Sequence, residues 1–412
     1  MFQRTRPIHD PVTIRIDRRE VVAERGEPLA VALLAAGETT LARSPKLHRP
    51  RAPACLRGDC DGCLARVDGV PNVMTCLRRA RGGEEIGTQN VLGSRKTDLL
   101  RLTDWFFPRG IDHHHLMAGI PAVSTLMQTF ARQMAGIGRL PDAATPARAA
   151  TKLEIDVLIV GAGLSGLACA AELVRVRGDA LRIAIVDENE RPGGSAAFAL
   201  PNEIDARARA IEGKASLLLR SSMVGFYEGT ALLVTTDGAV VAKPKVLVLA
   251  TGAHDGVLCS EGNDVPGVMS VRAVCNLAAR GILPTEGAVI VGSGAWAERA
   301  ATALGDRVRA RIAEADIAAV NGRGAVSAVT LRTGKKIACG AVAVALPAAP
   351  AFEIGVQAGA STQPASGGFA IATDDSGLAA PGVYAVGECV GLPFEPDALI
   401  ASGERAARSI AG

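Results

Sequence analysis

Stretches of apolar residues alternate with short polar or glycine-rich breaks along most of the chain, and their lengths predict strands and helices. Apolar residues occupy every second position from Val12 to Ile16, which predicts a strand with one buried face. Farther along, Ile155–Val160 is apolar except for Asp156, a helix-like apolar stretch follows, and Leu181–Val186 resembles a second strand. The order strand, helix, strand is typical of an α/β unit. The pattern therefore predicts a β-rich N-terminal part followed by an α/β part.

These patterns divide the chain into four predicted parts, in line with the two or three domains expected of 412 residues. Residues 1–98 form a small β-rich unit, and residues 99–150 are a helical connector that ends in a linker of small residues. The main α/β domain combines residues 151–258 with residues 346–412. Between them, residues 259–345 form a second, shortened domain that passes into a hairpin-like stretch.

Four cysteines lie close together in the β-rich unit: Cys55, Cys60, Cys63 and Cys76. Their spacing is C-x4-C-x2-C followed by x12-C, with three thiols on one loop and the fourth on a later strand. This is the plant-type arrangement for ligating a [2Fe–2S] cluster. Gly58 and Gly62 would let the loop curl and direct backbone amides at the sulfurs. Zinc is the alternative ligand of a C-x2-C pair, but zinc sites more often use two separated pairs.

A glycine-rich turn follows the first strand of the α/β part. Gly161-Ala162-Gly163-Leu164-Ser165-Gly166 matches G-x-G-x-x-G between a strand and a helix. The first glycine permits the tight turn, the second lets a pyrophosphate approach, and the third allows close helix–strand packing. The second strand ends at Asp187-Glu188, where an acid would bind ribose hydroxyls. These features predict a dinucleotide site with the phosphates at the helix N-terminus.

A second glycine turn, Gly292-Ser293-Gly294-Ala295-Trp296-Ala297, follows a strand at Ala288–Val291. Ala297 takes the third glycine position, and Glu314 follows at about the twenty-residue spacing of a ribose-binding acid. The supporting unit is short, however, because the chain soon enters the hairpin-like stretch Ala318–Val344. Trp296 also adds bulk near the pyrophosphate position. The sequence leaves open whether this turn binds a ligand.

The composition is that of an ordinary globular protein, with 48% hydrophobic and 21% charged residues. A net charge of +3 is too small to indicate a nucleic-acid partner. No apolar run is long enough to span a bilayer, and the first residues lack the apolar core of a signal peptide. We therefore expect a cytoplasmic protein, either free or peripheral at the inner face of the membrane.

Several longer phrases carry a resemblance to one family: RSPKLHRPRAP at Arg43–Pro53, DENERPGG at Asp187–Gly194, VLVLATGAH at Val246–His254, GNDVPGVMS at Gly262–Ser270 and GVYAVGECVG at Gly382–Gly391. They resemble the alpha subunit of heterotetrameric sarcosine oxidase and its relatives. Those relatives include opine oxidases, proline and hydroxyproline dehydrogenases, and hydrogen cyanide synthase. The likeness runs from about residue 10 to about residue 410.

The resemblance implies a ferredoxin-like β-grasp [2Fe–2S] domain joined to two dinucleotide-binding, Rossmann-like flavoprotein domains. FAD would occupy the first glycine turn, with NAD as the alternative in the same site and an additional FMN at a subunit interface. The residues expected to contact the dinucleotide are Gly161, Ala162, Gly163, Ser165, Gly166, Asp187, Glu188, Gly193, Gly194, Val224, Thr251, Gly252, Gly387 and Glu388.

The resemblance also implies a role in electron transfer. Substrate oxidation would take place on a D-amino-acid-oxidase-like flavoprotein beta subunit, with small additional subunits as further partners. The sarcosine oxidases lack the cluster cysteines in the equivalent unit, so their presence here favours a dehydrogenase that exports single electrons. Two alternatives remain: a self-contained NAD(P)H-dependent reductase, and a scaffold subunit with a vestigial nucleotide. The sequence identifies no catalytic residue, since the other five cysteines form no C-x-x-C pair.

Overall fold

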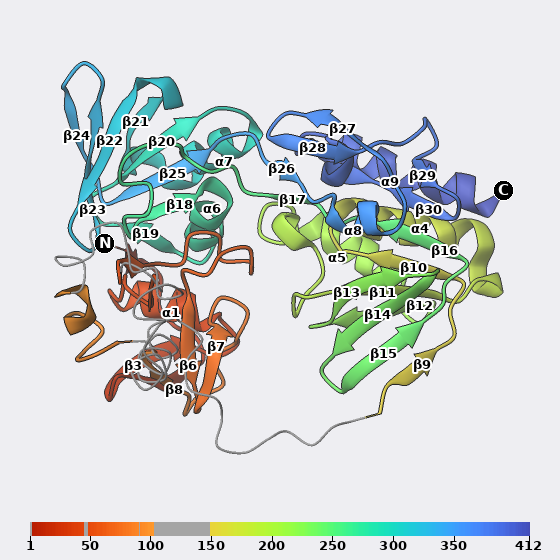
Figure 1. Cartoon of the computed structure of the whole chain (residues 1–412), viewed down its shortest axis with the longest axis horizontal. Coiled ribbons are helices and arrows are strands. Elements are labelled where there is room, and N and C mark those ends of the chain that lie inside the picture. The colour runs from red at the N-terminus through yellow and green to blue at the C-terminus, as the bar shows by residue number, and fades with distance from the viewer. Residues whose placement is uncertain (1, 45–47, 90, 103–148) are drawn as a thin grey trace, which may run out of the picture. The chain divides into compact units, whose positions relative to one another are not determined.

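A computed structural model describes residues 2–44, 48–89, 91–102 and 149–412 (Figure 1). The chain forms two compact units. Unit 1 contains Met1–Thr145 and Val257–Ala345, and unit 2 contains Pro146–Gly256 and Leu346–Gly412. Most of the predicted connector, including the histidines at 113–115 considered as metal ligands, lies outside the described residues.

The N-terminal part of unit 1 is a five-stranded sheet in the order β3-β2-β8-β6-β7 with one helix, α1 (Leu29–Ala35). β2 and β8 are parallel, and the other neighbours are antiparallel. α1 is apolar throughout, and its side chains from Leu29 to Leu34 are all buried. The sheet therefore folds around this helix to form one small core. The strands are β2 (Pro11–Ile16), β3 (Arg19–Glu24), β6 (Leu64–Val67), β7 (Val70–Met74) and β8 (Glu85–Gly87), with a small ribbon of β4 (Ala42–Arg43) and β5 (Pro50–Arg51).

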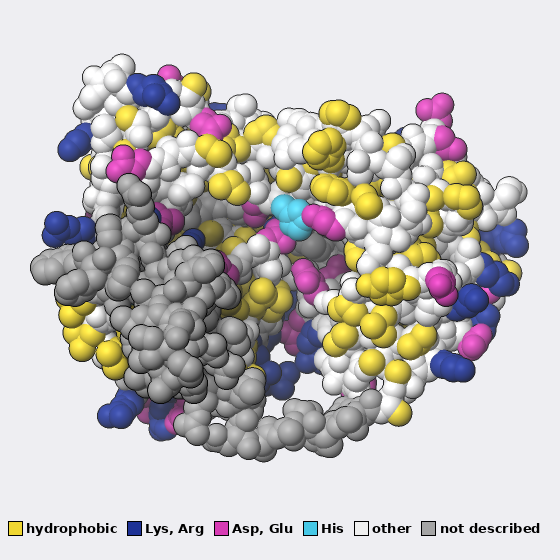
Figure 2. Space-filling view, in the orientation of Figure 1, with side chains coloured by type: hydrophobic (Ala, Val, Ile, Leu, Met, Phe, Trp, Pro, Cys, Tyr) yellow, Lys and Arg dark blue, Asp and Glu magenta, His cyan; other side chains and the backbone are white. Residues whose placement is uncertain are grey.

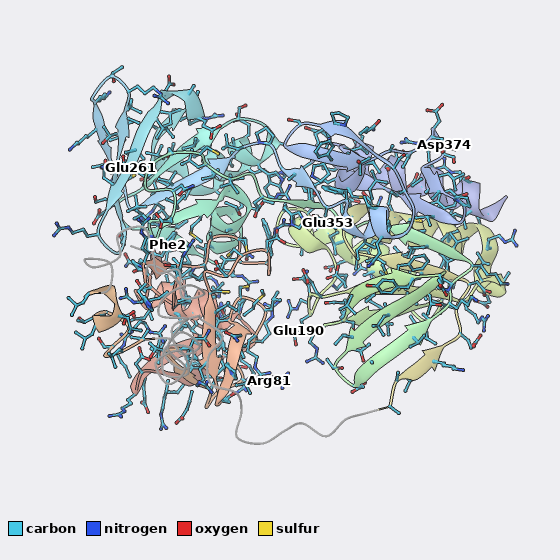
Figure 3. All side chains as sticks on the ribbon, viewed as in Figure 1. Phe2, Arg81, Glu190, Glu261, Glu353 and Asp374 are labelled. Carbon is cyan, nitrogen blue, oxygen red and sulfur yellow. The ribbon has the colours of Figure 1, made fainter. Side chains whose placement is uncertain are left out.

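The first strand of the chain connects the two parts of unit 1. β1 (Phe2–Arg4) pairs antiparallel with β19 (Ile282–Pro284), and Phe2 (labelled in Figure 3) is only 4% exposed. Thr5 continues the connection, because its N–H and its hydroxyl both donate to the carbonyl of Gly281. Backbone pairing and a buried aromatic side chain thus hold the N-terminus in place.

The rest of unit 1 contains a four-stranded parallel sheet. Its order is β18-β25-β20-β21, and the strands are β18 (Val268–Ser270), β20 (Ala288–Gly292), β21 (Val308–Ile312) and β25 (Ala341–Ala345). Helices α6 (Val271–Ala279) and α7 (Ala295–Leu304) accompany it, and β22 (Ile317–Gly322), β23 (Val326–Leu331) and β24 (Lys336–Ala338) form an antiparallel sheet. The hairpin-like stretch was predicted to reach residue 344, and that limit is wrong. Ala341–Ala345 is a fully buried inner strand of the parallel sheet.

Unit 2 is built on a six-stranded sheet in the order β12-β11-β10-β16-β30-β29, parallel except for β29. Helices α4 (Leu164–Arg177) and α9 (Pro396–Ala411) pack together so closely that a Cβ at Gly403 would lie 2.2 Å from the carbonyl of Ser165. The strands are β10 (Val157–Val160), β11 (Ile183–Asp187), β12 (Ala215–Leu219), β16 (Val246–Leu249), β29 (Leu378–Ala380) and β30 (Val383–Ala385).

Smaller elements complete unit 2. An antiparallel sheet with one parallel edge packs on the same core, and its strands are β13 (Ser222–Tyr227), β14 (Thr230–Thr235), β15 (Gly238–Ala242) and β9 (Thr151–Leu153). The others are α5 (Pro201–Ala210), α8 (Glu353–Gln357), β17 (Ala253–His254), β26 (Ala349–Pro350), β27 (Thr362–Ala365) and β28 (Gly368–Ile371).

The surface shows no concentration of positive charge on the face in Figure 2. There the Lys and Arg side chains are scattered among Asp and Glu side chains, as the small net charge leads one to expect. Within the described residues, no helix has the length and apolar character needed to cross a bilayer.

Candidate functional site

The four predicted ligand cysteines meet in unit 1 from two separate segments. Cys55, Cys60 and Cys63 lie on the loop between β5 and β6, and Cys76 lies in the turn after β7. The sulfurs of Cys55 and Cys60 are 3.4 Å apart. Cys60 is half-buried, while the other three are at most 5% exposed. The loop and the strand end therefore present four thiols at one largely buried point.

The four thiols act on one another electrostatically. Hydrogen bonds from Cys60 and Cys76 lower the pKa of Cys55 to about 2, and a hydrogen bond from Cys76 lowers the pKa of Cys63. The donors respond in the opposite direction, since these contacts and burial raise the pKa of Cys60 and of Cys76. Sulfurs that share protons in this way are placed to share a metal centre instead, because metal binding displaces thiol protons.

Glycines shape the cysteine loop, as the sequence predicts. A Cβ on Gly62 would lie 1.9 Å from the carbonyl oxygen of Ala52, so the backbone approaches too closely for any side chain. Gly58 has φ +92°, a conformation that L-residues rarely adopt, and its Cβ would meet the Leu77 side chain at 3.1 Å. The amide of Arg57 lies 3.5 Å from the Cys55 sulfur. Backbone donors thus face a position where thiolates would carry negative charge.

No three His, Cys, Asp or Glu side chains in the described residues, these cysteines included, are arranged around one point as ligands of a single metal ion. Support for a cluster therefore comes from the convergence of four thiols and from the family match given below.

The first glycine turn has the local geometry that a dinucleotide needs. Gly161 has φ +104°, and its Cβ would lie 2.2 Å from the carbonyl of Ala250. A Cβ on Gly166 would lie 2.0 Å from the carbonyl of Gly161. In contrast, a Cβ on Gly163 would meet nothing within 4 Å, although this residue stands directly before α4. Packing explains the outer two glycines, while the middle one faces open space at the helix N-terminus, where a phosphate is favoured.

Asp187 ends β11 beside the glycine turn. Its Oδ2 accepts the N–H of Ala162 at 2.7 Å, and its Oδ1 accepts the N–H of Asn189 at 2.8 Å. Because a carboxylate has about four acceptor positions, ribose hydroxyls can still donate to it. Glu188 is exposed in the same loop as Glu190, which is labelled in Figure 3.

Other predicted contact residues also lie around this turn. A Cβ on Gly194 would face the Cα of Gly163 at 3.7 Å. A Cβ on Gly387 would lie 2.5 Å from the Ser165 hydroxyl, so these two residues adjoin at the start of α4. Gly193 is in the left-handed region and donates its N–H to the carbonyl of the turn's second residue at 2.7 Å. Segments 161–166, 193–194 and 387–388 therefore come together, although they are far apart in the sequence.

The remaining predicted contacts are less closely joined to the turn. Thr251 donates its hydroxyl to the carbonyl of Ala351, which in turn donates its N–H to Gly252. Val224 lies at an irregularity in the β13–β14 pairing and is 51% exposed. Glu388 is partly buried at the start of a short 3-10 turn. Their contact with a dinucleotide stays a prediction.

The second glycine turn differs in what surrounds it. Gly294 precedes α7 with open space at its Cβ, and Ala297 is fully buried. The Arg272 guanidinium of α6 lies 5.5 Å from the centroid of the Trp296 ring, and both side chains are buried. Glu314 accepts the N–H of Cys259 at 3.0 Å. Trp296 thus packs against α6, and the only hydrogen bond that the structure gives this acid within the described residues leads to another segment.

Other residues considered as functional have ordinary environments. Cys389 is fully buried and donates to the carbonyl of Val386 at 3.2 Å, and burial raises its pKa to about 11. His254 pairs with Glu353 at 3.4 Å on the surface. Asp397 lies in the first turn of α9, where an acid suits the helix dipole.

Two features were missed by the sequence reasoning. Helix α6 begins with Ser270, whose hydroxyl accepts the N–H of Ala273, and its own N–H donates to Ala54, next to the first ligand cysteine. A serine before an apolar run was the available indication of a helix start. Thr75 was missed as well: it is a fully buried polar residue that donates to the carbonyl of Cys63.

Comparisons with known proteins agree with this geometry. Residues 9–91 match the model of a 2Fe-2S iron-sulfur cluster binding domain, and residues 159–213 match an NAD(P)-binding Rossmann-like domain. The sarcosine oxidase alpha subunit of Rhizobium meliloti (strain 1021) is 28% identical over 303 residues, which cover 64% of this chain and 30% of the relative. One subunit of the opine oxidase of Agrobacterium tumefaciens (strain Ach5) is 29% identical over 167 residues, covering 34% of this chain and 32% of that protein.

This chain belongs to the family of the sarcosine oxidase alpha subunits and their relatives. As a sarcosine oxidase alpha-like subunit it spans about 30% of the length of the R. meliloti relative. L-proline dehydrogenase from P. horikoshii has a similar fold, with a TM-score of 0.77 at 20% identity over 99% of this chain and 75% of that one. Thioredoxin reductase from T. acidophilum matches 63% of this chain and 98% of its own, with a TM-score of 0.51 at 19% identity. The predicted fold, a 2Fe-2S domain followed by Rossmann-like domains, is confirmed.

Proposed function

We propose that this alpha-like subunit transfers electrons within a flavin-dependent complex that oxidises CH–NH bonds of a secondary amine, an amino acid or an opine. The observation that carries the proposal is the meeting of four thiols from two segments of the ferredoxin-like domain. Such a site has little use in a protein that does not handle single electrons.

The cofactors follow from the two sites. Cys55, Cys60, Cys63 and Cys76 would hold a [2Fe–2S] cluster, and the turn Gly161–Gly166 would hold FAD, or NAD in the same position. When bound, a flavin takes up two electrons together and the cluster passes them on singly. The chain's own contribution is to bind, orient and shield these groups. An FMN at a subunit interface belongs to the proposal as well.

The partner would be a flavoprotein beta subunit of the D-amino-acid-oxidase type, on which the substrate is oxidised, with small additional subunits in the complex. The name of the R. meliloti relative, which is an alpha subunit, supports a hetero-oligomer. The electrons would leave for an external acceptor in the cytoplasm or at the inner face of the membrane.

The test is the Cys60→Ser variant, assembled into the complete complex. With substrate present, the partner's flavin should still be reduced, while reduction of the natural acceptor is lost. Cys259→Ser is the matched control, because Cys259 is an exposed thiol in the same unit and should leave turnover unchanged. Wild-type turnover by Cys60→Ser with the natural acceptor would remove the cluster from the pathway.

The four-stranded parallel sheet with its glycine turn supports a second candidate, an NAD(P)H-dependent flavin and iron–sulfur reductase. Rapid bleaching of the purified single chain by NADH would favour this reductase and contradict the relay. Mass spectrometry of released cofactors separates FAD from NAD. A chain with no cluster and only a trace of nucleotide would point to the scaffold alternative.

A further inference from the structure

Thr75 occupies a special place between two ligand arms. Cys63 begins the hairpin of β6 and β7, and Cys76 follows its end, where Leu64 pairs with Met74. Thr75 lies directly before Cys76 and is fully buried. Its hydroxyl donates to the Cys63 carbonyl at 2.8 Å, and its N–H reaches the same oxygen at 3.4 Å. One residue therefore ties the third ligand cysteine to the fourth.

The same residue is tied to helix α1. The carbonyl of Thr75 accepts the N–H of Ala30 at 3.0 Å, and the carbonyl of Arg78 accepts the N–H of Leu29 at 2.8 Å. Pro28, the residue before the helix, supplies no side-chain cap. The turn that carries Cys76 thus satisfies N–H groups that a helix start leaves without partners. Because α1 is buried, this turn rests on the most rigid part of the domain.

We propose that Thr75 is a positioning residue for the cluster: its hydroxyl fixes the distance between the Cys63 and Cys76 thiolates. The inference rests on the proposed [2Fe–2S] site. Without the hydroxyl, the Cys63 carbonyl keeps only the longer bond from the Thr75 amide, and a poorly satisfied buried acceptor is costly. The loop arm is then free to shift relative to the strand arm, while the strand arm stays on α1.

The experiment compares Thr75→Val with Thr75→Ser in the full chain, prepared anaerobically. Valine keeps the shape and both backbone bonds but lacks the hydroxyl, whereas serine keeps the hydroxyl. We expect Thr75→Val to lose its visible cluster absorbance about tenfold faster than wild type under an iron chelator. Tenfold in rate corresponds to about 1.4 kcal/mol, within the range for an unmet buried acceptor. Its reduced-cluster paramagnetic spectrum should also change shape, and Thr75→Ser should restore both properties.

Ile14→Val is the control for general destabilisation, because Ile14 is a fully buried residue of β2 on another strand. Its loss of stability should be comparable, about 1 kcal/mol, without faster bleaching. Thr75→Val with the wild-type bleaching rate and spectrum would overturn the inference, as would equal bleaching of Ile14→Val. If wild type itself holds no cluster, the proposed function fails first, and a cluster-bearing wild type with an unaltered Thr75→Val defeats only the inference.

Discussion

Gly62→Ala tests whether the cysteine loop depends on one close backbone contact. The added Cβ would lie 1.9 Å from the Ala52 oxygen and 2.8 Å from its carbonyl carbon. Both atoms belong to the backbone, so no rotation of a side chain can relieve the overlap. Segment 50–54 or the loop itself must move, and both lead into the ligand cysteines.

The expected cost lies near the upper end for overpacking, about 3 kcal/mol. In a domain of this size, a loss of that order lowers Tm by roughly 10–25 °C. Because the loop carries three of the four thiols, iron and sulfide content should fall together with Tm. Chemical iron and sulfide analysis, visible absorbance and calorimetry of the full chain measure all three effects.

Gly87→Ala is the matched control in the same domain. Gly87 lies in β8 without a positive φ, and its Cβ would meet nothing within 4 Å. This variant should keep the wild-type cluster content and at least the wild-type Tm. A Gly62→Ala protein with full iron and sulfide and an unchanged Tm would refute the reasoning, because the loop would then tolerate a shifted backbone.

Two further predictions concern unit 2. Gly163→Ala should keep the wild-type Tm but bind less dinucleotide, because only a ligand would meet its Cβ, whereas Gly166→Ala should lose both; cofactor release and calorimetry check this. Hydrogen bonds from Arg175 and then Arg408 lower the pKa of Glu172 from 4.5 to about 2, so the ionised form stabilises the fold above pH 4.5 and that contribution disappears as the pH falls towards 2. The stability difference between wild type and Glu172→Gln, measured by urea unfolding, should therefore be constant at neutral pH and shrink below pH 4.5; a difference that grows there would contradict the assignment.

Local chemistry was predictable where the residue types themselves carry it. The cysteine spacing and the first glycine turn need particular residues at particular separations, so the pattern survives in the sequence alone. Helix α6 was not recognised, because its buried face includes the charged Arg272, which packs on Trp296 instead of pointing to solvent. The inner strand at Ala341–Ala345 resembled part of a hairpin, because a strand buried on both faces shows no polar alternation.

Long-range hydrogen bonds were beyond the sequence for a different reason. Thr75 looks like an ordinary strand residue beside a cysteine, and its partner Ala30 is one of many apolar residues in α1. Neither residue type demands the other. Only the closed fold brings the end of β7 to the start of the helix, and the role of Thr75 follows from that meeting.

The two glycine turns show how far a motif reaches. In both, the middle glycine precedes a helix and has open space at its Cβ, so the motif fixes the phosphate side of each site equally. The acids differ: Asp187 accepts the N–H of Ala162 within its own turn, while Glu314 accepts the N–H of Cys259 from another segment. An acid joined to its turn is already in place for a ribose, whereas an acid engaged elsewhere must give up a hydrogen bond first. Ligand binding is therefore expected to be stronger at the first turn, for a reason that the spacing of the residues does not contain.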